Sequence, residues 1–249
     1  MTINYFLGKI NNEFKIGKKV FLAFLVCAVY LIFLLDKKTV WRLTHEDGLI
    51  ETFGAIMFLI SSVGFGLAYF RSSCSQNDHM GQIGLARKNI FYLLLSLFFL
   101  LAFLEEISWG QRIFGIETPT AIAKVNRQKE INIHNLEWFH GRDKSGNRKL
   151  FLQLLLNGDR LFSIFWFVYC VCIPLLEKYN QRMKKVFAKI RLPVIPLQYA
   201  FLFPLNYVAS KALEAIYPIY EHGIVETKET VLAILFVCVA LGQVYRLSR

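Results

Sequence analysis

Charged residues are scarce in this sequence. Of its 249 residues, 19% are charged and 55% are hydrophobic, whereas a soluble domain carries about 25% charged residues. Aromatic residues make up 15% of the chain, and the apolar residues stand in long blocks rather than at the spacing of an amphipathic helix or strand. This composition excludes a soluble globular domain, a disordered chain and a fibrous protein. It predicts an integral membrane protein.

The sequence also lacks the short motifs of several enzyme classes. It contains no G-x-S-x-G, S-x-x-K, H-E-x-x-H or G-x-G-x-x-G motif and no P-loop. Serine acyl-enzyme chemistry and nucleotide binding through these motifs therefore have no support. None of the five cysteines has the C-x-x-C spacing of a metal site. Four of them stand in apolar runs, which is typical of small packing residues.

Six apolar blocks are candidates for membrane-spanning helices, each of which needs about 20 residues to cross a bilayer. We therefore predict an all-α, polytopic integral membrane protein in which residues 1–249 form a single transmembrane domain. The predicted spans are residues 20–35, 49–70, 90–104, 161–176, 192–209 and 230–245.

The positive charge falls on one side of these predicted spans. The segments on that side carry a net charge of +13 in 58 residues, whereas those on the other side carry +1 in 89 residues. Because loops rich in Lys and Arg stay in the cytoplasm, we expect both termini to be cytoplasmic. We expect no nucleic-acid partner, since membrane topology accounts for the basic charge. The basic segments are residues 1–20, 71–89, 178–192 and 246–249, and the balanced ones are 36–48, 105–160 and 209–228.

Histidines and carboxylates gather in the segments predicted to face outward, which hold four of the five histidines. Four polar clusters stand at or near the outer ends of predicted spans, and a polar site between helices could be built from them. The candidates for catalysis are Asp47, Glu51, Glu105, Glu106 and His134; those for metal binding are His45, Glu106, His134 and His222; those for substrate binding are Trp109, Gln111, Arg112, Asn132 and Asn135.

The adjacent residues Glu105 and Glu106 are the least expected of these features. They end an outward-running helix, so both carboxylates would meet the negative end of the helix dipole. A salt bridge to Arg112 is one explanation, and a bound cation or a catalytic role is the other. Carboxylate ligands with one or two imidazoles would suit Zn²⁺, Mn²⁺ or Mg²⁺.

Residues 105–160 form the longest loop, and we predict it to be extracytoplasmic. Within it, the apolar run at residues 150–156 is too short to span a bilayer. It favours an interfacial or re-entrant helix at the level of the lipid headgroups, and the alternative is a longer, tilted fourth span. A lipid or lipid-linked substrate would lie beside the carboxylates at this level, where Arg112 could bind an anionic headgroup.

Two motifs in this region are similar to motifs of a known protein family. The sequence E-E-I-S-W-G-Q-R at residues 105–112 and the sequence E-I-N-I-H-N at residues 130–135 resemble those of a family of uncharacterised bacterial multi-pass membrane proteins. Residues 45–51 resemble an earlier motif of that family, so the resemblance covers roughly residues 44–136. It implies a polytopic protein of the bacterial inner membrane and no particular activity. A fainter similarity to zinc-dependent lipid hydrolases of the ceramidase kind lacks their second, paired-histidine motif.

Two functional hypotheses follow from the outer polar residues. In the first, the carboxylates and His134 act as general acid and base, or as metal ligands, in hydrolysis or group transfer on a lipid or lipid-linked substrate. In the second, the protein is a non-catalytic membrane subunit or scaffold. The same residues then form a buried polar network that holds the outer loop against the spans.

Overall fold

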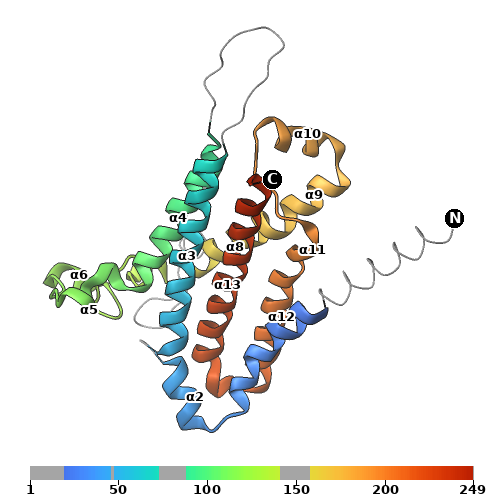
Figure 1. Ribbon diagram of the computed structural model, residues 1–249. Helices are drawn as coiled ribbons and strands as arrows, with labels where there is room; N and C mark the ends of the chain where they lie inside the picture. Colours follow the sequence, from blue (N-terminus) through green and yellow to red (C-terminus); the bar gives the residue numbers. More distant parts are fainter. Residues whose placement is uncertain (1–19, 46–47, 73–87, 141–157, 249) are drawn as a thin grey trace.

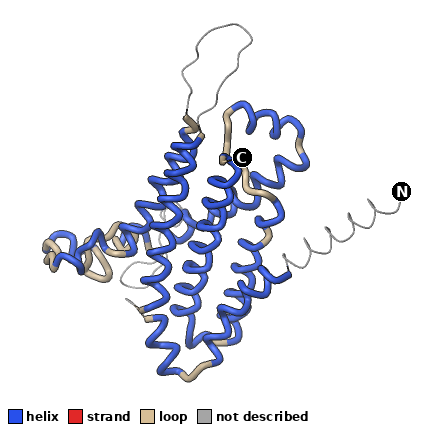
Figure 2. The backbone as a smooth tube through the Cα atoms, in the orientation of Figure 1, coloured by secondary structure: helices blue, strands red, loops and turns tan. Residues whose placement is uncertain are grey.

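The computed structural model describes residues 20–45, 48–72, 88–140 and 158–248 (Figure 1). Within these ranges the chain is helical and contains no β-strand (Figure 2). The predicted all-α class is therefore confirmed for this part of the chain. Asp47 and the predicted interfacial or re-entrant helix at residues 150–156 lie outside the described residues.

Long helices form the bundle, and short ones form the connections. The elements are η1 (Tyr30–Leu34), α2 (Lys37–Thr44), α3 (Leu49–Arg71), α4 (Ile90–Glu106), η2 (Ser108–Gly110), α5 (Gln111–Phe114), α6 (Thr120–Val125), η3 (Glu137–Phe139), α8 (Gly158–Phe167), η4 (Val168–Cys172, a π-helical segment), α9 (Ile173–Tyr179), α10 (Gln181–Lys189), α11 (Leu197–Ala200), α12 (Leu202–Ile216), η5 (Pro218–Tyr220) and α13 (Glu221–Leu247).

Three helical stretches of the described chain are long and apolar enough to cross a membrane: Lys37–Arg71, Arg160–Tyr179 and Pro218–Leu247. They contain the second, fourth and sixth predicted spans, so the prediction of a membrane protein is supported. The first predicted span corresponds to a shorter apolar helix, Val20–Leu34. The third corresponds to α4, which has 17 residues.

The fifth predicted span differs from a continuous helix. Residues 192–196 are not helical, and the helical chain resumes as α11 and α12. Pro193 and Pro196 explain the break, because proline disfavours a helical conformation in the residue before it. Pro204 is tolerated inside α12 because it is the third residue of that helix, where the backbone N–H has no partner within the helix.

The core of the bundle is rich in phenylalanine and lies between α3, α4, α8 and α13 (Figure 1). Phe65 and Phe99 stack with their ring centroids 5.6 Å apart, and Phe99 contacts Phe236 at 4.6 Å. All three are fully buried. Two serines add hydrogen bonds between α3 and α4: Ser62 Oγ donates to the carbonyl of Ser96 (2.8 Å), and Ser96 Oγ donates to the carbonyl of Ser62 (2.9 Å).

Neutral polar side chains also join the helices. Asn206 of α12 accepts a hydrogen bond from the Tyr30 hydroxyl (2.6 Å) and donates to the carbonyl of Lys228 in α13 (3.0 Å). Gln243 of α13 accepts one from the Tyr92 hydroxyl of α4 (3.1 Å). Asn206 and Gln243 are buried, so these bonds satisfy groups that would otherwise be costly in an apolar interior.

Glycines allow α3 and α13 to approach closely. A Cβ atom at Gly64 would lie 2.9 Å from Cβ of Ala240, and one at Gly54 would lie 2.8 Å from Oγ1 of Thr230. Real Cβ atoms do not make such contacts, so the spacing of the two helices depends on these glycines. Small residues have this role in membrane helices, where close packing replaces the hydrophobic effect.

We expect Gly64→Leu to lower the melting temperature of the purified protein. The side chain would force α3 and α13 apart, and such overpacking costs about 1–3 kcal/mol, or about 2–4 °C per kcal/mol in a chain of this length. Gly242→Leu is the matched control, because Gly242 of α13 has no side chain or distant backbone within 4 Å of its Cβ position. Equal melting temperatures for the two variants would contradict the close packing of α3 and α13.

Candidate functional site

The carboxylate of Glu105 joins the end of α4 to the second motif of the outer loop. Its Oε1 accepts a hydrogen bond from Trp109 Nε1 (2.6 Å). Its Oε2 accepts hydrogen bonds from the backbone N–H groups of Ile133 (2.6 Å) and His134 (2.9 Å). The ring Nδ1 of His134 lies 3.3 Å from the same oxygen. Both oxygens of Glu105 are thus occupied, and its side chain is only 17% exposed.

A left-handed turn directly after α4 brings Ser108 to the same motif. Ser108 and Trp109 have φ values of 47° and 55°, and Gly110 has 77°. Non-glycine residues adopt this conformation rarely, and they need surrounding interactions to hold it. Here Ser108 Oγ donates a hydrogen bond to Glu130, and Asn132 Nδ2 donates one to Ser108 Oγ (3.1 Å).

Further amides complete this arrangement, which we call the loop network. Asn126 Nδ2 donates to Asn132 Oδ1 (2.7 Å), and Gln111 Oε1 accepts from the backbone N–H of Ile131 (2.7 Å). Asn135 Nδ2 lies 2.9 Å from His134 Nε2. The two motifs singled out in the sequence therefore contact each other. The loop network comprises Glu105, Ser108, Trp109, Gln111, Asn126, Glu130, Asn132, His134 and Asn135.

The loop network holds Glu105 in its ionised form. Burial alone would raise the pKa of this carboxyl group. The hydrogen bonds from the side chain and backbone of His134, from Trp109 and from Ile133 outweigh that effect, and the pKa lies below its usual value. The donated hydrogen bonds thus offset the negative end of the α4 dipole at Glu105.

Glu106 lies in a different environment. The pKa of its carboxyl group is raised well above the usual value, first by burial and then by the negative charges of Glu229, Glu226, Glu51 and Glu105. Among these, Glu51 is in the first turn of α3, and Glu226 and Glu229 are in α13. Three helices therefore contribute to a carboxylate cluster, which consists of Glu51, Glu106, Glu226 and Glu229.

Two basic side chains lie beside the cluster on α13. His222 Nδ1 is 3.8 Å from Glu226 Oε1, and Lys228 Nζ is 3.5 Å from Glu229 Oε1. The arrangement therefore places Glu106, whose pKa is raised, beside two carboxylates that lie close to basic groups.

The length of the helices matches the thickness of a bilayer. From Glu51 to Arg71, α3 rises about 30 Å at about 1.5 Å per residue, and α13 rises the same distance from Glu226 to Arg246. The hydrocarbon core of a bilayer is also about 30 Å thick. When the two arginines lie at one edge of the hydrocarbon, the carboxylates lie at the other edge.

The predicted site residues thus divide into separate groups. Glu51 and Glu106 belong to the carboxylate cluster, whereas Glu105, Trp109, Gln111, Asn132, His134 and Asn135 belong to the loop network. His45 and His222 line a pocket between α2 and α13. Arg112 lies in α5, and its side chain is not among those described. Among the described residues, no three His, Cys, Asp or Glu side chains are grouped so that they could hold a metal ion.

Glu226 and Glu229 are not among the site residues predicted from the sequence. Their spacing of three residues in one helix places both on one face near the outer end of the last span. That spacing is the signal that would have identified them. Ser108, Asn126 and Glu130 were also missed as partners, because their hydrogen bonds depend on the turn after α4.

In the part of the chain that the structure describes, the fold is all-helical, three helices are able to cross a membrane, and a carboxylate cluster lies near one end of the bundle. Comparisons with family models, with curated proteins and with solved structures give no match to the chain.

Proposed function

We propose that this protein is a multi-pass membrane enzyme that hydrolyses, or transfers a group from, a lipid or lipid-linked substrate at the outer membrane boundary. The observation that carries the proposal is the carboxyl group of Glu106, whose pKa is raised well above its usual value beside carboxylates from two other helices. Pairs of carboxyl groups with separated pKa values are the usual means of combining an acid with a base in one active site.

In this proposal Glu106 is the general acid. Its raised pKa favours the protonated form, which can donate a proton to the oxygen of a leaving group. An ionised carboxylate of the cluster, Glu51 or Glu226, acts as the base that activates water or an acceptor hydroxyl. A strongly raised pKa in a polar site at a membrane boundary favours such a role over a purely structural one.

The same proposal includes the membrane topology of the chain. We propose that the shorter predicted spans at residues 20–35, 90–104 and 192–209 also lie in the membrane, which gives six spans with both termini in the cytoplasm of a bacterial cell. The loop network then lies outside the inner membrane. Its role is to fix the end of α4, so that Glu106 faces the cluster rather than solvent.

Lipid turnover in proteoliposomes tests the proposed activity. Wild-type protein is reconstituted in a total polar lipid extract from bacteria, and new lipid products are measured by mass spectrometry. We expect Glu106→Gln to reduce turnover at least about 100-fold, the usual contribution of a general acid, with normal yield and oligomer size. Glu117→Gln, which changes an exposed carboxylate of the same loop, is the control and leaves turnover unchanged. Equal turnover in the two variants would contradict the role of Glu106.

The loop network favours a second candidate, a non-catalytic subunit whose polar residues hold the outer loop for a partner protein. Most of the predicted substrate-binding groups already have hydrogen-bond partners inside the loop. Under this alternative, wild-type proteoliposomes produce no new lipid product. His134→Ala then lowers the folded yield, and Glu106→Gln leaves the binding of any co-purified partner intact.

A further inference from the structure

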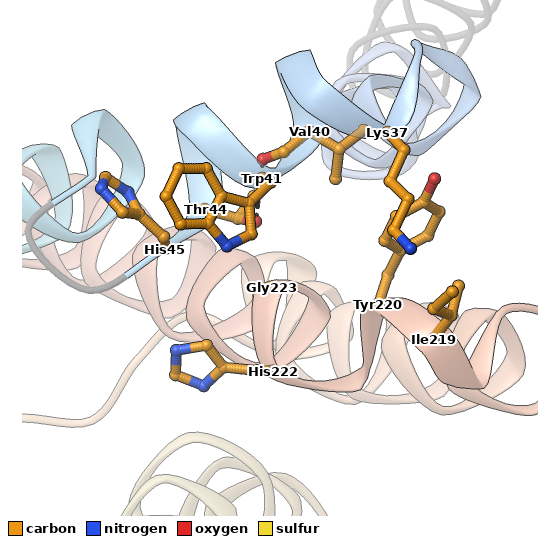
Figure 3. Close-up of a pocket in the computed structure, with 9 residues that line it drawn as sticks. All are labelled: Lys37, Val40, Trp41, Thr44, His45, Ile219, Tyr220, His222 and Gly223. Carbon is orange, nitrogen blue, oxygen red and sulfur yellow. Dashed lines mark hydrogen bonds between the residues drawn. The ribbon is translucent and has the colours of Figure 1, made fainter.

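A second site lies between α2 and the beginning of α13, in a pocket of about 360 Å³. Figure 3 shows the side chains of Lys37, Trp41 and His45 on the α2 side, with His222 on the α13 side. Tyr220, in the turn before α13, also lines it. We call it the α2–α13 pocket. It contains none of the carboxylate cluster and none of the loop network.

The lining of the α2–α13 pocket is basic. One lysine and two histidines line it, and no aspartate or glutamate does. Two carboxylates lie near the lining without being part of it: Glu226 lies 3.8 Å from Nδ1 of the lining residue His222, and Asp36 accepts a hydrogen bond from the backbone N–H of Thr39. An anionic group entering the pocket would therefore meet an ammonium group and imidazole nitrogens.

Buried contacts between α2 and α13 form the wall of the pocket. Val40 of α2 and Ile224 of α13 are buried against each other with Tyr30 and Phe33. Gly223 of α13 lies so close to Thr44 of α2 that a Cβ atom at this position would collide with its hydroxyl group. These contacts fix the two helices that bear the lining residues relative to each other, which reduces the ordering cost of binding.

The depth of the pocket indicates the source of the anion. From His222 to Arg246, α13 rises about 36 Å. This distance exceeds the hydrocarbon core of about 30 Å but lies within the 40–45 Å or so that includes the headgroups. Trp41, whose side chain is 64% exposed, stands at the same end of the bundle, as expected of tryptophan at a membrane interface.

We infer that the α2–α13 pocket binds the phosphate group of an anionic phospholipid headgroup. Lys37 supplies the charge that a phosphate requires, the imidazoles of His45 and His222 supply ring N–H donors, and Trp41 covers the apolar part of the lipid beside the phosphate. His222 also contacts Glu226 of the carboxylate cluster, but Lys37 belongs to neither the cluster nor the loop network, so binding through Lys37 does not depend on the activity proposed for the cluster.

Direct binding to the full-length protein in detergent tests the inference. The probe is dihexanoylphosphatidylglycerol, and its Kd is measured by isothermal titration calorimetry. We expect Lys37→Gln to weaken binding about tenfold, a loss of about 1.4 kcal/mol, and Lys37→Glu to abolish it. Lys38→Gln and Lys38→Glu are matched controls, because Lys38 is the next residue of α2 and does not line the pocket. They leave the Kd unchanged.

Other outcomes overturn the inference. Equal weakening at both lysines means that surface charge alone attracts the lipid. If dihexanoylglycerol, which has no phosphate, binds as tightly as dihexanoylphosphatidylglycerol, the pocket recognises only the apolar part of the lipid. Binding of inorganic phosphate as tight as that of the lipid means a site for the free ion. Absence of lipid binding to wild type also refutes it.

Melting temperatures equal to that of the wild type verify that the variants are folded. Lipid turnover is measured separately, and it tests the activity proposed for the carboxylate cluster.

Discussion

Glu105→Gln is expected to lower the free energy of unfolding by about 2–4 kcal/mol, since hydrogen bonds to a charged group contribute about 1.5–3 kcal/mol each. The amide loses the negative charge that attracts Trp109, the backbone N–H groups of Ile133 and His134, and the His134 ring. The NH₂ group of the glutamine would also place a hydrogen-bond donor against the N–H groups of Trp109, Ile133 and His134. Thermal unfolding of the purified protein in detergent measures the effect, which corresponds to a fall of about 2–4 °C per kcal/mol.

The control for this substitution is Glu117→Gln in the same loop. Glu117 is exposed, so its replacement should change the melting temperature by less than about 1 °C. His134→Ala should have an intermediate effect, because it removes the ring contact and leaves the backbone N–H bond to Glu105. If all three variants melt like wild type, the loop network does not hold the outer loop against α4.

The stability provided by Glu105 also depends on pH. Its pKa is lower in the folded protein than in the unfolded chain. A carboxyl group with a lowered folded pKa contributes its stability above the unfolded pKa, about 4.3, and loses that contribution as the pH falls through the folded value. The difference in melting temperature between wild type and Glu105→Gln should therefore be constant near pH 7 and should shrink below about pH 4.

The membrane class and the division of charge could be predicted from the sequence because both depend on composition along the chain. The blocks at residues 49–70, 161–176 and 230–245 are long and uninterrupted, and all three fall in helices that can cross a membrane. The break at residues 192–196 was predicted less well. Its apolar residues fit a span, but Pro193 and Pro196 prevent a helix at that point.

The site was harder to predict than the fold, because Glu105 and Glu106 are neighbours with the same side chain but lie in different environments. The sequence indicates that Glu105 and Glu106 both need compensation at the end of a helix. It does not indicate that Trp109 and His134 compensate Glu105 while Glu106 faces other carboxylates. That difference depends on the left-handed turn at Ser108, where two non-glycine residues adopt positive φ values. Sequence patterns do not favour that conformation for serine or tryptophan.

Glu106→Gln is expected to have the opposite effect to Glu105→Gln and to raise the melting temperature at neutral pH. The carboxyl group of Glu106 is disfavoured in its ionised form by burial and by the charges of the cluster. Glutamine has nearly the same shape as the protonated acid, and its amide does not ionise. A gain of about 2–4 °C corresponds to about 1 kcal/mol in a chain of this length.

The pH dependence separates this effect from a change in packing. In wild type the folded protein retains the proton of Glu106 at pH values where the unfolded chain has lost it. Stability from this group is therefore fully present below the unfolded pKa of about 4.3 and falls as the pH rises towards the folded value. The melting temperatures of wild type and Glu106→Gln should coincide at low pH and diverge as the pH rises. A constant difference, or a lower melting temperature at all pH values, would contradict a protonated Glu106.

A stabilised Glu106→Gln variant that has lost lipid turnover would connect the two proposals about this residue. Active sites often retain groups that destabilise the fold, because function requires them there. A scaffold has no need of a carboxyl group among carboxylates, and glutamine would serve it better. Stabilisation together with loss of turnover therefore favours the enzyme. Stabilisation together with retained partner binding, in proteoliposomes where wild type produces no new lipid, favours the scaffold.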